Sequence, residues 1–220
     1  MDALARLLPV ARPLLQDVDT TLMTRGAPGG HPVLRLLATL GVAPSHVLES
    51  VADLEPARLR EAGATLRRAA RTYGWSTPPT VGSWEGAAAR HYGAAVAALG
   101  EHLAGDVDAS MVARLRGTAS YVEDLARWQQ DLRDDMAGML ARVMTSAEAV
   151  TLRTGWTADA GALTAEVAAA AEIATALLRV AEEAAARAQD LVRAAGELDE
   201  LAYHPPASTG SGHNGPIRLS

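Results

Sequence analysis

The feature that most constrains this fold is a long apolar seam close to the end of the chain. Between residues 158 and 202, apolar side chains recur four and three residues apart, which is the spacing of one face of an α-helix. Most members of this seam are alanine, and its large members are Leu163, Val167, Leu177, Leu191 and Leu198. Alanine has the highest helix propensity but buries little area, so an alanine-lined helix needs neighbours along its whole length. We therefore expect a long amphipathic helix over 153–202 that packs on other helices.

A second seam precedes the first and predicts another long helix, over 109–152. It keeps the alternating spacing of a coiled coil, and its members are Leu115, Thr118, Val122, Leu125, Gln129, Leu132, Met136, Met139, Val143, Ser146 and Val150. Several carboxylates between 123 and 135 lie outside the seam. On an amphipathic helix, such residues form the solvated face, and we interpret them in that way.

Composition supports helices and argues against strands. Hydrophobic residues make up 49% of the chain, but aromatic residues only 4%, and phenylalanine is absent. No run of β-branched and aromatic residues alternates with polar ones, as a half-buried strand requires. The predicted fold class is therefore all-α, in the form of an alanine-rich elongated helical bundle.

Proline and glycine divide the N-terminal region, residues 1–55. Short helices are expected around 33–40 and 45–53, after a loop rich in glycine and proline. The pattern before this loop is helical, but Pro9 and Pro13 argue against a single straight helix there. We therefore predict several short helices in this region.

A stronger helical region follows, over 56–152. Pro56 begins a predicted helix over 56–73, and a breaker-rich segment over 74–83 separates it from a helix over 84–103. We expect these two helices to run antiparallel. The segment 203–220 consists mainly of Ser, Thr, Gly, Asn and Pro, a composition typical of a disordered tail.

The charge of the chain argues against nucleic acid as a partner. The formal net charge is −6, and a net-acidic protein is repelled by phosphate backbones. All basic residues except histidine are arginine, and the one basic cluster consists of Arg58, Arg60, Arg67, Arg68 and Arg71. We interpret this cluster as a solvated helix face.

The sequence also predicts no membrane span and no signal peptide. The most apolar stretch, 158–181, contains Glu166, Glu172 and Arg179. The first residues lack the basic region and cleavage site of a secretory signal. If the protein leaves the cell, we expect a route that does not depend on a signal peptide.

Catalytic and metal-binding patterns are not found in the sequence. There is no cysteine, and the six histidines do not occur in a metal-binding spacing. His91 and His102 would share a helix face, but about 16 Å apart, which is too far for one ion. We therefore expect neither an enzyme nor a bound metal or cofactor.

One tripeptide, Trp84-Glu85-Gly86, carries a family resemblance. It stands between two predicted helices, and Ala87, Ala88 and Tyr92 follow it. In this setting it resembles the WxG superfamily, the early-secreted-antigen type of helical hairpins exported by type VII secretion systems. The resemblance covers about 56–150. It implies that the tripeptide forms the turn of a helical hairpin.

The resemblance also implies roles for three residues in protein binding. Trp84 would insert its ring into a groove of the hairpin or of its partner, and Gly86 would allow another backbone to pass closely. Tyr92 would belong to the small–small–aromatic continuation after the turn. The family's export signal, a tyrosine with an acidic residue four positions later, is not matched, because Tyr121 is followed by Asp124 at three.

Two functions follow as hypotheses. The first is a WxG-like substrate of type VII secretion, or such a substrate's partner, which is secreted or placed at the cell surface. It would form a homo- or heterodimer with a helical partner through Trp84, Gly86 and Tyr92 and through the large members of the second-half seam, Leu163, Val167, Leu177, Leu191 and Leu198. The second is a cytoplasmic helical-bundle scaffold or adaptor with no export role. We expect incomplete coverage of the 163–202 seam within one chain, and therefore a partner.

The absence of ligand spacing generates the first testable prediction. Thermal unfolding followed by circular dichroism should give the same midpoint with and without a metal chelator, because no ion is expected to contribute to folding. A midpoint that falls by many degrees in the chelator would contradict this.

Overall fold

The chain forms an all-α bundle, as predicted. The structure is a computed structural model that describes residues 2–74, 85–105, 110–154 and 160–199. Within these ranges every regular element is a helix, and no strand occurs. The helices are α1 (Ala3–Arg25), α2 (Pro32–Leu40), α3 (Pro44–Ala52), α4 (Pro56–Gly74), α5 (Ala87–Ala104), α6 (Met111–Met144), α7 (Ala147–Thr154) and α8 (Ala160–Asp199).

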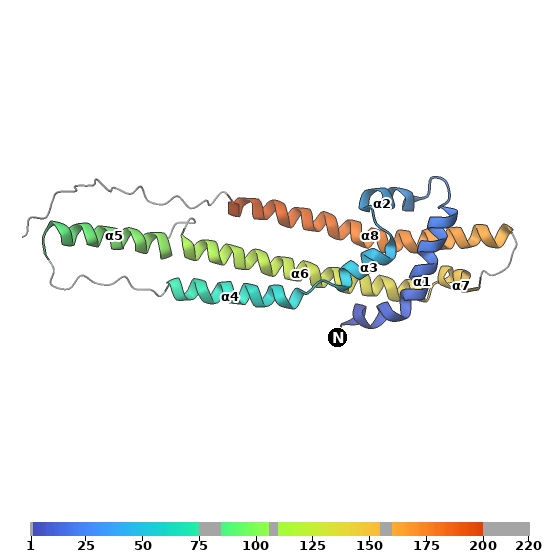
Figure 1. The fold of residues 1–220 in the computed structure, drawn as a ribbon, viewed down its shortest axis with the longest axis horizontal. Helices are drawn as coiled ribbons and strands as arrows, with labels where there is room; N and C mark the ends of the chain where they lie inside the picture. The colour runs from blue at the N-terminus through green and yellow to red at the C-terminus, as the bar shows by residue number, and fades with distance from the viewer. Residues whose placement is uncertain (1, 75–84, 106–109, 155–159, 200–220) are drawn as a thin grey trace, which may run out of the picture.

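Two long antiparallel helices, α6 and α8, set the long axis of the molecule (Figure 1). Helix α4 packs along the first half of α6, and α1, α2, α3 and α7 gather around the other half and around α8. Helix α5 lies beyond this assembly, at the far end from α1 (Figure 1). The molecule is therefore thick at one end and thin at the other.

The hydrophobic core lies at the thick end. Its large side chains come from different helices and include Leu15, Leu36, Leu48, Met136, Leu140 and Leu177, all fully or almost fully buried. Helix α8 contributes Ala170, Ala171 and Ala174, which are not exposed at all. Their small side chains allow neighbouring helices to approach the α8 backbone closely, as the seam in the sequence indicated.

A buried guanidinium fixes the N-terminal helices on α6. The Arg133 side chain is 8% exposed. Its Nη1 donates to the backbone oxygens of Val51, Ala52 and Leu54 at 2.9, 2.6 and 2.8 Å, where α3 ends. The Val51 carbonyl also accepts the Leu54 N–H at 3.3 Å, and the Ala52 and Leu54 carbonyls lie at and beyond the end of the helix, so the arginine acts as a cap from a distant part of the chain.

The same arginine also holds the beginning of α1. Its Nε donates to Asp2 Oδ2 at 2.6 Å, and Asp2 Oδ1 accepts from the backbone N–H of Ala5 at 2.9 Å, which caps the helix. Burial acts to raise the pKa of Asp2, but the hydrogen bonds from Ala5 and Arg133 outweigh it, and the pKa lies below its ordinary value. Arg133 therefore joins α1, α3 and α6 at one point.

Small residues allow close contact between α4 and α6. Ala70, Ala119 and Ala126 are buried in this contact. At Gly63, a Cβ would lie 3.1 Å from Glu123 Cγ and 3.5 Å from the Ala119 carbonyl oxygen, so even one methyl group would be tight. This packing places α4 beside α6 along most of its length.

The prediction of one helix over 109–152 was wrong. Helix α6 ends at Met144, and α7 begins at Ala147. The Thr145 hydroxyl donates to the Ala141 and Arg142 carbonyls, and Ser146 Oγ accepts from the Ala149 N–H and so starts a new helix. These local side-chain bonds compete with helix continuation. Val150, predicted to lie in the seam, is 56% exposed.

The other helices agree with the sequence patterns to different degrees. Helix α4 begins and ends within one residue of the predicted 56–73. Helix α1 includes Pro9 and Pro13 as one helix, and it changes direction within its first half (Figure 1), as prolines inside a helix cause. The 56–73 segment, however, packs along α6, and it contacts the 84–103 segment only near its end. The two segments run in opposite directions, as predicted, but they do not pack side by side along their lengths (Figure 1); Trp84 lies outside the described residues.

We predict that Arg133→Ala lowers the free energy of unfolding by about 3 kcal/mol, because it leaves three carbonyls and a carboxylate without their donor. Urea denaturation would measure the change. Arg193→Ala, which removes an exposed ion pair with Asp190 on the same helix, is the control and should change stability by less than about 0.5 kcal/mol. Equal effects of the two substitutions would contradict a special role for Arg133.

A second prediction concerns Asp19, which lies on α1 beside the start of α3. Burial raises the pKa of Asp19, and contact with Ser45 opposes this only in part. The ionised form is thus penalised in the folded state. This penalty is absent below the aspartate pKa of the unfolded chain and is complete above the raised pKa of the folded chain. Asp19→Asn should therefore stabilise the protein at pH 7 and have no such effect at pH 3. Urea denaturation at both pH values would measure this, and a destabilised variant at pH 7 would contradict it.

Candidate protein-binding surfaces

Helix α5 presents an apolar stripe to solvent. None of its residues is buried. Ala88, Tyr92, Ala95 and Leu99 follow one another at four, three and four residues, and all four are exposed, Tyr92 to 42% and Leu99 to 55%. We call these four residues the α5 stripe. The spacing places them on one face of the helix.

The opposite side of α5 rests on the rest of the molecule. Ala89, Gly93, Val96 and Leu103 are half-buried, and the contacts of α5 are with α6 and α4. The small side chains on this side bury little area. On this side α5 is thus half-buried, whereas its apolar stripe is exposed in the described chain.

The residues of the tripeptide are only partly described. Trp84 lies outside the described residues. Gly86 is the N-cap of α5 and has φ of +105°, a conformation that side chains disfavour. No described atom lies within 4 Å of a Cβ built there. The glycine is therefore needed for its backbone angle, and the close backbone passage predicted for it is not formed with the described part of this chain.

The predicted seam of α8 is divided in two by the fold. Leu177 is fully buried in the chain's own core, so a partner cannot reach it, and Val167 is half-buried nearby. Leu163 is 37% exposed, and Leu191 is half-buried where, among the described helices, α8 lies beside α6. The side chain of Leu198 lies outside the description. Own-chain helices therefore cover the middle of the seam, contrary to the partner-binding role predicted for Leu177.

Ion pairs hold α8 beneath the N-terminal helices. Arg25 pairs with Glu166, His31 Nε2 lies 3.3 Å from Glu172 Oε1, and Arg35 binds Glu182 through two contacts at 2.5 and 3.0 Å. Their partners lie at the end of α1, at the N-cap of α2 and within α2. These pairs account for acidic residues within an otherwise apolar helix.

Helix α8 is also the one described segment with the length and composition of a possible membrane span, over Gly161–Gly196. Half of its most apolar window is buried inside the protein. A core helix of a bundle has the same composition, and the burial of Ala170, Ala174 and Leu177 accounts for its apolar character here.

Beyond the core, α6 and α8 enclose a groove with charged rims, where three aspartates and two arginines line it. The Trp128 indole N–H donates to the Ala184 carbonyl at 2.9 Å, which fixes the ring between the two helices. A cavity of about 370 Å³ lies beside it. Its lining includes Asp124, Asp131 and Asp190, with Leu191 as a further apolar member.

A basic groove runs between α4 and α6. One cavity of about 380 Å³ is lined by Arg60, Arg67 and Arg127, among others, and a neighbouring one of about 350 Å³ by Arg67, Arg71 and Arg116. Arg67 pairs with Glu123. The sequence predicts a solvated face for the arginines of α4. Their convergence with Arg116 is not predictable from the sequence, because only the packing of α4 on α6 brings these residues together.

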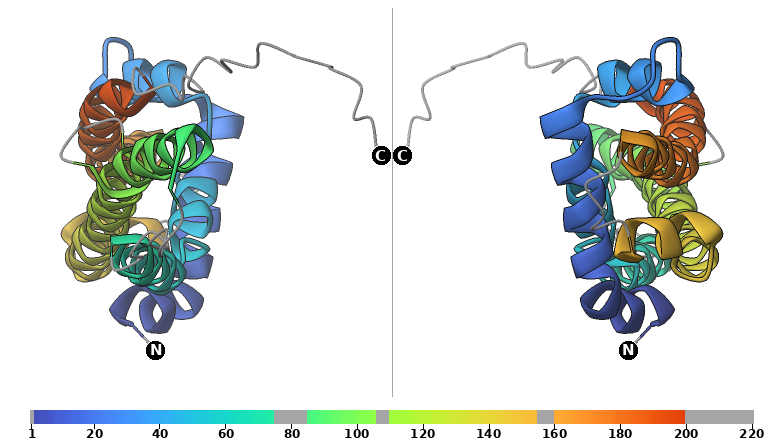
Figure 2. Two further views of the ribbon diagram at one scale, coloured as in Figure 1. Left: turned by 90° about the vertical axis from the view of Figure 1, so that its left-hand side faces the viewer. Right: turned by 90° about the vertical axis from the view of Figure 1, so that its right-hand side faces the viewer.

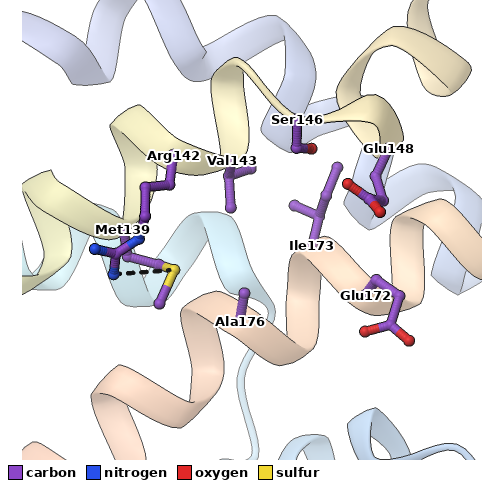
Figure 3. A pocket seen from close by; sticks show the side chains of 8 residues that line it. All are labelled: Met139, Arg142, Val143, Ser146, Glu148, Glu172, Ile173 and Ala176. Atoms are coloured by element: carbon purple, nitrogen blue, oxygen red, sulfur yellow. Dashed lines mark hydrogen bonds between the residues drawn. The ribbon is translucent and has the colours of Figure 1, made fainter.

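A further cavity at the thick end has no catalytic arrangement among its lining residues. It measures about 260 Å³ and lies where α6, α7 and α8 meet (Figure 3). Arg142 Nη2 lies 3.7 Å from Met139 Sδ, and Ser146 Oγ already caps α7. The hydrogen bond with its own backbone N–H and then that with Ser146 lower the pKa of Glu148, which favours the carboxylate. This is the opposite of the raised pKa that a general acid at neutral pH requires.

Neither metal-ligand clusters among the described residues nor similarity to known proteins points to a function. Within the described ranges, no three His, Asp or Glu side chains gather as metal ligands would. Comparisons with protein-family models, curated proteins and solved structures find no match. The candidate sites therefore rest on the surfaces of this chain alone.

Proposed function

We propose that this protein functions by helix-mediated protein–protein interaction, with α5 as its principal binding element. We further propose that it is a WxG-like substrate of type VII secretion, or the partner of such a substrate. The first proposal rests on the exposed apolar stripe of α5. The second rests on this stripe and on the resemblance of the tripeptide to the WxG superfamily.

The observation that carries the proposal is the exposure of the α5 stripe. An isolated helix of this length is marginally stable in water, and none of the residues of α5 is buried in the described chain. Anchors at i, i+4, i+7 and i+11 are the pattern by which an amphipathic helix enters a groove or pairs with another helix. Tyr92 and Leu99 provide the two large anchors, and Ala88 and Ala95 allow close approach between them.

One feature of the chain supports the proposal, although α4 and α5 do not pack as the hairpin that the resemblance implies. The helix begins directly after the tripeptide, and Gly86 supplies its N-cap. In the described fold, α4 pairs with α6, which leaves α5 as an extension of the bundle. A partner helix on the stripe would then complete a helical pair whose first helix begins directly after the tripeptide.

A cytoplasmic scaffold or adaptor is the second candidate function. One observation favours it, namely that Tyr121 is followed by an acidic residue at three positions and not at four. This hypothesis uses the same binding helix but requires no export.

Photo-crosslinking would test the binding role of α5. We predict that a photoreactive amino acid placed at Leu99, in cells that naturally express the protein, forms an adduct of one defined mass with a helical partner. The matched control is the same amino acid at Val150, which is equally exposed on α7 and should give no such adduct. Identical adduct patterns at both positions, or none at Leu99, would refute the proposed binding role.

Export can be tested separately in the same cells. The tagged protein should accumulate in the medium when the type VII secretion ATPase is active and remain in the cells when the ATPase is inactivated. Retention in both cases, together with a Leu99 adduct, would favour the scaffold hypothesis.

A further inference from the structure

One of the two cavities between α4 and α6 is lined by arginines and contains no carboxylate. Its lining consists of Arg67, Ala70, Arg71, Arg116 and Ser120, and its volume is about 350 Å³. We call these five residues the arginine pocket. Arg67 and Arg71 are one turn apart on α4, and Arg116 and Ser120 are one turn apart on α6. Every polar side chain of the lining can therefore donate hydrogen bonds into the same space.

The packing of α4 on α6 holds the pocket in register. The two helices run antiparallel (Figure 1), and a Cβ at Gly74 would lie 4.0 Å from Val112 Cγ2. Counting back along α4 and forward along α6 from this contact brings Arg71 and Arg116 opposite each other. Ala70, which is 1% exposed, closes the floor of the pocket. Two arginines thus face each other across a close helix contact.

The chain itself neutralises the charge of the pocket only in part. Arg67 pairs with Glu123, which lines the neighbouring cavity and not this one. Arg71 and Arg116 are exposed, and within the described ranges neither forms an ion pair or a side-chain hydrogen bond. The three arginines and Glu123 together carry a formal charge of +2, from three positive charges and one negative.

No other carboxylate of the described helices compensates this charge. Helix α4 has no acidic residue after Glu61, and α6 has none before Glu123. The one acidic residue of α5, Glu101, lies against Gly105 at the end of its own helix. Viewed along the long axis, α4 and α8 lie apart (Figure 2), and among the described helices α4 contacts only α5 and α6. The acidic side chains of α8 are therefore not packed against α4.

We propose that the arginine pocket binds a phosphate-type dianion, a tetrahedral oxyanion with a charge of about −2 at neutral pH. Guanidinium groups match pairs of phosphate oxygens with parallel N–H donors. Arg67 retains free donors beside its bond to Glu123, because a guanidinium has five. A charge of about −2 compensates the +2 of the group, whereas a single carboxylate compensates half of it. This site is separate from the α5 stripe and does not rest on the proposed function.

Titration of the full-length chain with sodium phosphate tests the proposal. We expect the backbone amide NMR signals of Ala70, Arg116 and Ser120 to shift saturably, with a dissociation constant of about 1 mM or less. Sodium chloride keeps the ionic strength constant, and on its own it should not reproduce these shifts. Shifts that do not saturate, or that occur only outside the pocket, would overturn the proposal.

Paired substitutions separate a built site from general attraction to a basic helix. Arg71→Gln with Arg116→Gln removes the two arginines that lack a partner in the described chain and should weaken phosphate binding at least about tenfold. Arg58→Gln with Arg68→Gln is the matched control, because it removes the same charge from exposed positions outside the pocket. It should change the affinity less than about twofold. An equal loss in both double variants would overturn the assignment to this pocket.

Two probes distinguish free phosphate from phosphate carried by a protein side chain. Inorganic phosphate is compared with phosphoserine whose amino and carboxyl groups are capped as amides. Tighter binding of the capped phosphoserine assigns the pocket to a phosphorylated partner, and tighter or equal binding of inorganic phosphate assigns it to the free ion. Capped serine without phosphate should not bind, and equal binding of this probe would overturn the proposal. None of these results affects the crosslink at Leu99.

Discussion

The buried guanidinium of Arg133 is the point on which the arrangement of helices depends. A charge in the protein interior is tolerated only when its donors are used, and here the carboxylate of Asp2 and three carbonyls at the end of α3 use them. These bonds fix α1 and α3 on one side of α6. Leu15, Leu48 and Met136 can then close a single core. As a consequence, the opposite side of α6 carries no N-terminal helix and remains a surface.

Alanine has two different effects along α8. In the middle of the helix, small side chains bring α8 close to several neighbours, and Leu177 and Ala174 are fully buried. Toward the C-terminal end it lies, among the described helices, beside α6, and the same composition leaves Leu191 half-buried beside Trp128. The pairs of Glu166 and Glu182 with arginines of the N-terminal region stabilise the first of these two parts. Which part of α8 belongs to the core and which part remains at the surface is thus decided by the helices that pack on it.

The sequence predicted helices well where helix-breaking residues or a long apolar pattern mark the helix. Pro56 and the following apolar stripe gave α4 almost to the residue, and the alanine-rich seam indicated α8. The sequence-based prediction was wrong at Thr145 and Ser146. There the apolar spacing of a coiled coil continues although the helix ends, because hydrogen bonds between the side-chain hydroxyls and the backbone end the helix. Of the candidate site residues, Tyr92 is exposed on α5, whereas Leu177 belongs to the core. A periodic pattern identifies an apolar face but not the partner that covers it.

The sequence by itself determined the all-α class, the elongated form and the acidic character, because helix propensity, breaker positions and net charge are local or additive properties. Only the tertiary structure decided that α4 pairs with α6, that Leu177 is internal and that the α5 stripe is exposed in the described chain. It also brought Arg67 and Arg71 of α4 together with Arg116 of α6. These outcomes depend on contacts between residues far apart in the chain, and spacing along the chain contains no information about which of several apolar faces will meet.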